Sequence, residues 1–431
     1  MAEKTNSGKH LTQIVGEAYM DLHTRAAQGA FVIWIAINVP AELFYGFDNV
    51  VYGVPESHAA LNAAKGAGVT QCEKAERLGY SMDLCSYARI DIGSVSDGGK
   101  DSPTFGLPKP NLLVSDNNNC SLLVKWFEVH HRAMGVPHFV IDVPFCYEAQ
   151  KEKDRQYIIR QFKDLIRFIE KLSGQKFNET QAMQAVANTS EGINHWKRFL
   201  TFAEHRPSGI TAFDSFVQMA PFLVARGTPQ FAAHYKMLAE ETGQRVADGI
   251  FPVPDEKYRL FWDNIAPWHQ LRDMSGRLAA MGANIVGATY TSCIGTVEGS
   301  FELYPFDGGD PLEYCARTQN CYMCPHGMKL RGKSMAEAVR KLHIDGIVFA
   351  SNRSCKPYSI TQMDQQKLMS DHFGVPGVMI EVDHADARKY SRESTFTRLE
   401  ALMEAIASGR TYEDGRQNPQ PIESGDQHEP Q

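Results

Sequence analysis

Three cysteines stand where a thiolate could bind a soft metal. Cys120 ends the segment PNLLVSDNNNC and opens a predicted helix, and Cys355 follows DGIVFASNRS and precedes a turn and a helix. Cys85, in SMDLCSYARIDIG, precedes a further helical turn after a polar break. In open α/β sheets, ligands bind beyond the carboxyl ends of the strands, and a helix start lowers the pKa of a thiol. Cys85, Cys120 and Cys355 are therefore candidate ligands of an iron–sulfur cluster or of zinc.

Each of these cysteines also has a plainer interpretation. A single cysteine in apolar surroundings is more often a small core residue than a ligand. Their shared position after strands favours the ligand interpretation for the three together. Cys72, Cys146 and Cys293 lack such a position and are predicted to be core or pocket-lining residues.

A second group of cysteines is clustered in the sequence itself. Cys315, Cys321 and Cys324 have the spacing C-x5-C-x2-C, and His326 follows closely. Such clustering favours metal binding more strongly than scattered cysteines do, and it fits a zinc knuckle, a further cluster or part of a larger cluster. The four-cysteine spacing of ferredoxins is absent, so a packed loop of ordinary thiols stays open as the alternative.

Nucleotide-binding motifs have little support. The segment GMKLRGKS (327–334) fits the P-loop pattern GxxxxGK[ST], but a P-loop follows a buried strand, and the preceding residues CYMCPH include a proline and no β-rich run. We interpret it as a chance match. No GxGxxG follows a predicted strand, which leaves dinucleotide binding unsupported. His130 and His131 are predicted to lie on a helix flank as solvated or capping side chains.

Composition narrows the class of protein. The 431 residues are 43% hydrophobic, enough for a large core and two or more domains. A formal net charge of -7 with dispersed basic residues argues against a nucleic-acid partner. The start of the chain lacks the layout of a signal peptide, and the apolar run at 30–39 is shorter than the roughly 20 residues of a membrane span. We expect a cytoplasmic protein with no membrane contact, whose nine cysteines stay reduced.

The order of elements predicts an α/β fold with parallel sheets. Residues 110–120 and 138–144 are predicted strands, and the helix predicted at 121–135 between them makes a strand–helix–strand unit. The second half alternates in the same way. Its predicted strands are 284–293, 345–351 and 377–383, and its predicted helices are 271–281, 334–342, 361–373 and 394–407.

These elements divide the chain into five segments. Between the α/β parts lies a predicted helical region whose first helix, at 151–172, has its apolar residues on one face and ends at Ser173-Gly174. The tail has few apolar residues and is predicted to be disordered or to lie on a partner. The segments are a helical stretch at 1–50, a first α/β domain at 51–150, a helical region at 151–270, a second α/β domain at 271–408 and the tail at 409–431.

From about Val39 to Ala407 the chain resembles the 2-hydroxyacyl-CoA dehydratase and benzoyl-CoA reductase family. The resemblance is carried by VPAELFYGF, LCSYARIDIG, PNLLVSDNNNC, GVPHFVIDVPF, DGIVFASNRSCKP and GVPGVMIEVDHADARKYSRESTFTRLEAL. It implies two flavodoxin-like (Rossmann-like) α/β domains with an additional helical region and a [4Fe-4S] cluster in the cleft. The ligands would be Cys85, Cys120 and Cys355, which leaves one iron open to substrate.

The resemblance also implies a role for Glu42 in VPAEL, which matches an acidic residue near the substrate in the family. A carboxylate that stabilises a helix start is the equally weighted alternative.

Within the family, the chain is most similar to the B subunits of ATP-dependent benzoyl-CoA reductases. This similarity lies in the motif CSYAR, in the chain length and in the additional cysteines Cys315, Cys321 and Cys324. This similarity implies the reduction of an aromatic acyl-CoA to a cyclic dienoyl-CoA. The implied partners are a homologous cluster-binding subunit, activator-type subunits that hydrolyse ATP, and ferredoxin as electron donor.

Three different functions remain open. A 2-hydroxyacyl-CoA dehydratase subunit would have the same cluster. Cys315, Cys321 and Cys324 suggest a reductase with a double-cubane cluster, that is, a larger or additional cluster. The same cysteines would also suit a non-catalytic zinc-binding or scaffold protein.

Overall fold

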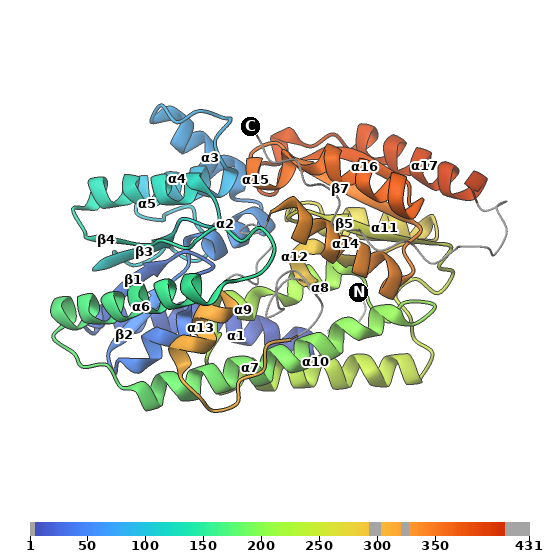
Figure 1. Cartoon of the computed structure of the whole chain (residues 1–431). Coiled ribbons are helices and arrows are strands. Elements are labelled where there is room, and N and C mark those ends of the chain that lie inside the picture. Colours follow the sequence, from blue (N-terminus) through green and yellow to red (C-terminus); the bar gives the residue numbers. More distant parts are fainter. Residues whose placement is uncertain (1–4, 293–302, 320–326, 410–431) are drawn as a thin grey trace, which may run out of the picture.

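A computed structural model of the protein describes residues 5–292, 303–319 and 327–409. Two four-stranded sheets, each entirely parallel, form the two halves of the molecule (Figure 1). The strand order is β2-β1-β3-β4 in the first sheet and β6-β5-β7-β8 in the second. The strands are β1 (Phe31–Ile35), β2 (Val50–Gly53), β3 (Leu112–Asp116), β4 (His138–Ile141), β5 (Tyr258–Asp263), β6 (Ala283–Ala288), β7 (Gly346–Asn352) and β8 (Gly377–Val382).

The two sheets have the same topology. In each, the first strand along the chain lies between the second and the third, and the fourth lies at the edge, which is the order of flavodoxin-like folds. The prediction of two flavodoxin-like α/β domains is therefore confirmed. β3, β4, β6, β7 and β8 correspond to the strands predicted from the sequence.

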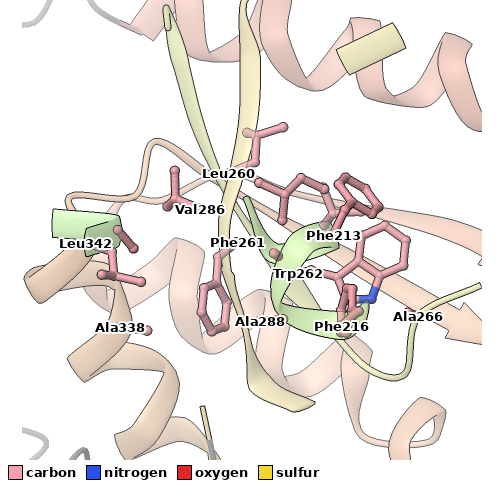
Figure 2. Close-up of a cluster of buried hydrophobic side chains, with 14 of the residues drawn as sticks. Phe213, Phe216, Leu260, Phe261, Trp262, Ala266, Val286, Ala288, Ala338 and Leu342 are labelled. Carbon is pink, nitrogen blue, oxygen red and sulfur yellow. The ribbon is translucent and has the colours of Figure 1, made fainter. Parts of the chain in front are cut away.

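Two interior strands lie in segments predicted to be helical, and these expectations are wrong. β1 falls within residues 1–50 and β5 within residues 151–270. In Figure 2, Phe261 of β5 points toward Leu342, while the neighbouring Trp262 points the other way, toward Phe213. A strand that is covered on both faces has no alternation of apolar and polar residues, so the period that identifies a strand is missing.

Two helices, α5 and α6, end where the sequence predicts. Gly135 (φ 67°) ends α5, and Gly174 (φ 73°) ends α6, in the left-handed conformation that glycine adopts most readily. The helices are α2 (Pro55–Ala64), α3 (Gly68–Arg77), α4 (Ser86–Ser96), α5 (Ser121–Met134) and α6 (Glu152–Ser173).

Long helices form a further layer along one side of both sheets (Figure 1). α7 and α10 pack closely, because a Cβ atom on Gly192 of α7 would lie 2.3 Å from the ring of Phe231 of α10. Short helices connect this layer to the second sheet. The elements are α1 (Asn6–Ala27), η1 (Ala41–Gly46), α7 (Glu179–Thr201), η2 (Phe202–Glu204), α8 (Ala212–Gln218), α9 (Ala220–Val224) and α10 (Pro229–Ala247).

The second domain completes the described chain. Residues 410–431 of the predicted disordered tail lie outside the described residues. None of the described helices is long and apolar enough to cross a membrane. The remaining helices are α11 (Leu271–Ala280), α12 (Thr289–Ser292), α13 (Pro311–Thr318), α14 (Met328–Leu342), α15 (Lys356–Ser359), α16 (Gln362–Phe373), η3 (Ala387–Lys389) and α17 (Arg392–Gly409).

Candidate functional site

A cavity of about 110 Å3 lies at the carboxyl ends of both sheets. Ile37, after β1, and Cys120, after β3, line it from the first domain. Ile265, Cys355 and His384, which follow β5, β7 and β8, line it from the second. Parallel sheets of this type bind ligands at this edge, so the two domains present their binding edges to one shared space.

The structure brings the three predicted cysteines together, because Cys85, Cys120 and Cys355 all line this cavity. Each is the N-cap residue of a helix, α4, α5 and α15 respectively, as the sequence predicts. We refer to this space as the cysteine cavity.

Two thiols of this cavity, those of Cys85 and Cys120, are neutral without a metal. Burial raises the pKa of Cys85 to about 12, against the opposing effect of the backbone N–H groups of Ala88 and Tyr87. Burial likewise raises the pKa of Cys120 to about 11, opposed by the N–H of Leu123. A bound cation would reverse this balance, because thiolates are the ligand form and the N–H groups at the starts of α4 and α5 stabilise negative sulfur.

The donor set, three thiols, suits the chemistry of an iron–sulfur cluster. Among the described residues, no three Cys, His, Asp or Glu side chains converge closely enough to hold one metal ion. A cubane cluster binds each thiolate through a different iron and so needs cysteines that are spread around a space. Three thiols from separate segments, around a cavity whose lining is mostly apolar, meet that requirement.

His384 and Tyr87 lie against Cys85. The Nε2 atom of His384 is 3.6 Å from Cys85 Sγ and 3.0 Å from the hydroxyl of Ser86. Its ring packs edge-on against Tyr87, with 4.3 Å between ring centroids. Burial lowers the pKa of His384 to about 4, so the imidazole is neutral at pH 7. The phenol of Tyr87 accepts a hydrogen bond from the indole of Trp268, which fixes this side of the cavity.

Glu56 is a site residue that sequence reasoning missed. It lines the cysteine cavity, and one of its carboxyl oxygens accepts the N–H of Ile37 at 3.0 Å. Burial raises its pKa to about 8, so most of this carboxyl group is protonated at pH 7. Glu56 lies in the first turn of α2, just after β2. The rule that singled out Cys120, a polar residue that follows a strand and opens a helix, could have found it.

Glu42 lies outside the cysteine cavity. It is in the first turn of η1, and its carboxylate is 3.2 Å from the Nε atom of Arg226. Arg226 lines both the cysteine cavity and a separate cavity of about 30 Å3, whereas Glu42 lines only the smaller one. The structure therefore places Glu42 behind a cation of the site.

Of the clustered cysteines Cys315, Cys321 and Cys324, only Cys315 lies within the described residues. Cys315 is buried in α13 and lines the same small cavity as Glu42. Burial raises the pKa of its thiol well above the ordinary value. Cys321 and Cys324 lie outside the described residues.

Three further sequence interpretations can be compared with the structure. Cys72 and Cys146 are buried, as predicted for core residues. The P-loop-like segment is helical from Met328 on, so its N–H groups do not form a phosphate-binding loop, and the match is a chance one. His130 is not solvated as expected. It is buried 2.7 Å from the carboxylate of Asp91, which approaches from another helix, α4.

A larger, mostly apolar cavity of about 820 Å3 adjoins the cysteine cavity. α1 and α2 form one side of it, and α8 and α9 form another. Because six residues line both cavities, a long ligand could reach from one into the other. The shared residues are Ile37, Glu56, Tyr87, Met219, Leu223 and Tyr290.

Known proteins resemble the chain over most of its length. The profile of the family described as 2-hydroxyglutaryl-CoA dehydratase, D-component, matches residues 36–406. The (R)-phenyllactyl-CoA dehydratase alpha subunit of Clostridium sporogenes is 31% identical over 90% of this chain and 92% of its own. The (R)-2-hydroxyisocaproyl-CoA dehydratase alpha subunit of Clostridioides difficile is 30% identical, covering 94% and 97%. The B subunit of the benzoyl-CoA reductase of Thauera aromatica is 27% identical, covering 86% and 87%.

Proposed function

The chain belongs to the 2-hydroxyglutaryl-CoA dehydratase D-component family, and from this premise we propose that it is the cluster-bearing, substrate-binding subunit of an ATP-dependent benzoyl-CoA reductase. The reaction adds two electrons and two protons to the aromatic ring and yields a cyclic dienoyl-CoA. One observation carries the cluster-binding part of the proposal: Cys85, Cys120 and Cys355, from three distant segments, line one largely apolar cavity.

In this proposal the three thiolates hold a [4Fe-4S] cluster. When bound, the cluster would supply electrons one at a time at low potential. The chain's own residues would exclude water, because the walls include apolar and aromatic side chains, and they would provide protons. The apolar walls include Leu122, Leu123, Trp126, Met219 and Phe222.

Glu56 is the proposed proton donor. Its carboxyl group faces the cavity and, with a pKa near 8, still carries its proton at pH 7. A general acid works best when its pKa lies near the operating pH. Burial has raised the pKa of Glu56 from the ordinary 4.5 to about 8, just above neutral pH.

The large adjoining cavity is the proposed path of the coenzyme A arm. Its volume and apolar lining suit a long flexible chain better than the smaller cysteine cavity does. The acyl group would then occupy the end near the cysteines, beside Trp126 and Phe222.

Partners complete the proposed enzyme. The relatives of the chain are alpha and B subunits, so it is proposed to act with a homologous cluster-binding subunit. ATP would be hydrolysed on separate activator-type subunits, which agrees with the helical conformation of GMKLRGKS. Reduced ferredoxin is the proposed electron donor, and the cytoplasm is the proposed location.

A 2-hydroxyacyl-CoA dehydratase subunit is the second candidate. The specific observation in its favour is the higher identity to dehydratase alpha subunits, 31% and 30%, than to the reductase subunit, 27%. The same three cysteines and the same cavity would serve this reaction.

Turnover by the complex, purified without oxygen together with its partners, decides between the candidates. With reduced ferredoxin and ATP, we expect benzoyl-CoA to be converted to the dienoyl-CoA and (R)-phenyllactyl-CoA to remain unchanged. Dehydration of phenyllactyl-CoA without formation of dienoyl-CoA would establish the dehydratase instead.

Iron and sulfide analysis of the same preparation tests the double-cubane and zinc-binding interpretations. About four irons per chain supports one cubane, and about eight supports a double cubane. A colourless, iron-free and folded protein would favour the zinc-binding or scaffold protein.

A further inference from the structure

We propose that the buried ion pair of Glu42 and Arg226 restricts the site to uncharged acyl groups. This inference rests on the proposed acyl-CoA function and names the class of acyl group. In it, Glu42 is a specificity-determining residue, which acts by cancelling the charge of Arg226.

The pair forms a partition between two cavities. Arg226 lines both the cysteine cavity and the small cavity that contains Cys315, whereas Glu42 lines only the small one. The Nε atom of Arg226 is 3.2 Å from the Glu42 carboxylate, and an Nη2 hydrogen is donated to the carbonyl of Val39 at 2.7 Å. Glu42 is 4% exposed and Arg226 is 7% exposed. Solvent therefore screens neither charge effectively.

The backbone holds Arg226 in place. Gly227, next to it, has a φ of 97°, which few other residues adopt, and a Cβ atom there would lie 2.6 Å from the ring of Tyr45. These contacts hold the backbone at Arg226, and the 2.7 Å hydrogen bond to the carbonyl of Val39 holds its guanidinium beside Glu42. Both charges also act on Tyr45, Tyr52 and Cys315, so the pair is the local source of charge.

The rest of the cysteine cavity offers no cation. Among the described residues that line it, Arg226 is the one lysine or arginine. The two ring nitrogens of His384 already have partners, since Nε2 is 3.0 Å from the hydroxyl of Ser86 and Nδ1 is 3.3 Å from Oδ1 of Asn352. Bound thiolates would add negative charge. An acyl group with a terminal carboxylate would lose its hydration and find no uncompensated positive charge.

Removal of the Glu42 charge should reverse this selection. In Glu42→Gln, the side chain keeps its size, but the guanidinium charge is no longer cancelled. Arg226 would then attract a carboxylate in the cavity, because buried charges interact strongly.

A matched pair of probes tests the proposal without turnover. Pentanoyl-CoA and glutaryl-CoA have the same chain length and differ in a terminal methyl or carboxylate group. Their affinities, and that of benzoyl-CoA, would be measured by calorimetry on the complete complex, without oxygen and without ATP. We expect the wild type to bind glutaryl-CoA at least about tenfold more weakly than pentanoyl-CoA, a difference of about 1.4 kcal/mol.

In Glu42→Gln, glutaryl-CoA should bind about tenfold more tightly, with pentanoyl-CoA changed by less than about twofold. The double variant Glu42→Gln/Arg226→Gln should lose this gain, which separates charge from general loosening of the site. Glu400→Gln, an exposed carboxylate on α17, is the control and should change nothing.

Two results would overturn the inference. One is equal binding of glutaryl-CoA and pentanoyl-CoA by the wild type, a measurement that needs no variant and so stands even if Glu42→Gln does not fold. The other is a folded Glu42→Gln protein with no gain for glutaryl-CoA. Failure of benzoyl-CoA and both other thioesters to bind would refute the proposed function itself.

Discussion

His384 Nε2 lies 3.6 Å from Cys85 Sγ, although 299 positions separate the two residues in the chain. Cys85 opens α4 in the first domain, and His384 follows β8 in the second. The neighbourhood of Cys85 is therefore completed only when the two domains are docked. Loss of that docking would disturb the cysteine cavity even if each sheet stayed folded.

Replacement of Cys85, Cys120 or Cys355 by alanine should each abolish iron binding and activity together. Three thiolates hold a cluster through three different irons, and the remaining two ligands would leave it labile. Iron and acid-labile sulfide, measured after purification without oxygen, should fall from about four per chain toward zero. Cys146→Ala, at a buried cysteine that does not line the cavity, should keep its iron. Retained iron in all three variants would refute the ligand assignment.

Glu56→Gln should flatten the pH dependence of stability. The folded-state pKa of Glu56, about 8, lies above the ordinary 4.5, so the native state holds the extra proton between these values. The contribution of Glu56 to the free energy of unfolding is complete below about pH 4.5 and is lost as the pH rises through about 8. Between these values the free energy of unfolding falls by up to about 1.4 kcal/mol per pH unit. Denaturant unfolding of the metal-free chain at pH 6, 7 and 8 measures it. Parallel curves for the wild type and Glu56→Gln would contradict the raised pKa.

Much of the fold follows from local patterns, and the exceptions have physical causes. β3 and β7 could be recognised because each is a short apolar run that leads into polar residues and a helix. β1 and β5 lie in the interior of their sheets and are buried on both faces, so neither shows the alternation that marks a strand. β3 and β7 are interior and buried as well, so the polar residues and the helix directly after them, and not the pattern of the strands themselves, identified them.

Some residues of the candidate site could likewise be predicted from local sequence, and others could not. Cys120 and Cys355 could be predicted because their own neighbours in the chain, a strand before and a helix after, determine where they lie. Glu42 could not be placed, because its partner Arg226 comes from the turn after α9. His130 was misjudged for the same reason, since Asp91 lies on another helix. Contacts between distant segments depend on the packing of the domains, which no local pattern reports.

Gly93→Ala should destabilise the protein by about 1–3 kcal/mol, as expected for overpacking. Gly93 lies in α4, and a Cβ atom there would be 2.0 Å from the backbone carbonyl oxygen of Gln71 in α3, which cannot rotate away. Gly276→Ala in α11 is the matched control, because no atom lies within 4 Å of its added Cβ, and the better helix propensity of alanine should raise stability by up to about 1 kcal/mol. Denaturant midpoints compare the two. Equal effects of both changes would show that α3 and α4 are not in this close contact.

Asp386→Ala should lower stability by up to about 3 kcal/mol, since it removes one of the two carboxylates that pair with a buried cation. Arg89 in α4 is fully buried, with its guanidinium 2.9 Å from Asp386 and 2.7 Å from Glu76. The double variant Arg89→Met/Asp386→Leu removes both charges and should lie much closer to the wild type. Burial alone would raise the pKa of Asp386. The hydrogen bonds from Arg388 and Arg89 outweigh this effect and lower the pKa to about 2. Its contribution is thus complete above about pH 4 and is lost as the pH falls toward 2. If the double variant is as unstable as Asp386→Ala, the loss of stability does not come from the buried charge of Arg89.

Ala60→Trp should weaken the binding of acyl-CoA without removing iron. Ala60 is a half-buried residue of α2 that lines the large cavity but not the cysteine cavity, so an indole there would fill the proposed path of the coenzyme A arm. We expect the dissociation constant of benzoyl-CoA, measured by calorimetry on the complete complex, to rise by about tenfold or more, since a blocked path forfeits the contacts of the arm. Iron content should stay at the wild-type value, because the three cysteines are untouched. Ala405→Trp, at an exposed position of α17, adds the same indole away from the cavity and should leave both quantities unchanged. An unaltered dissociation constant in Ala60→Trp would mean that the coenzyme reaches the cysteines by another route.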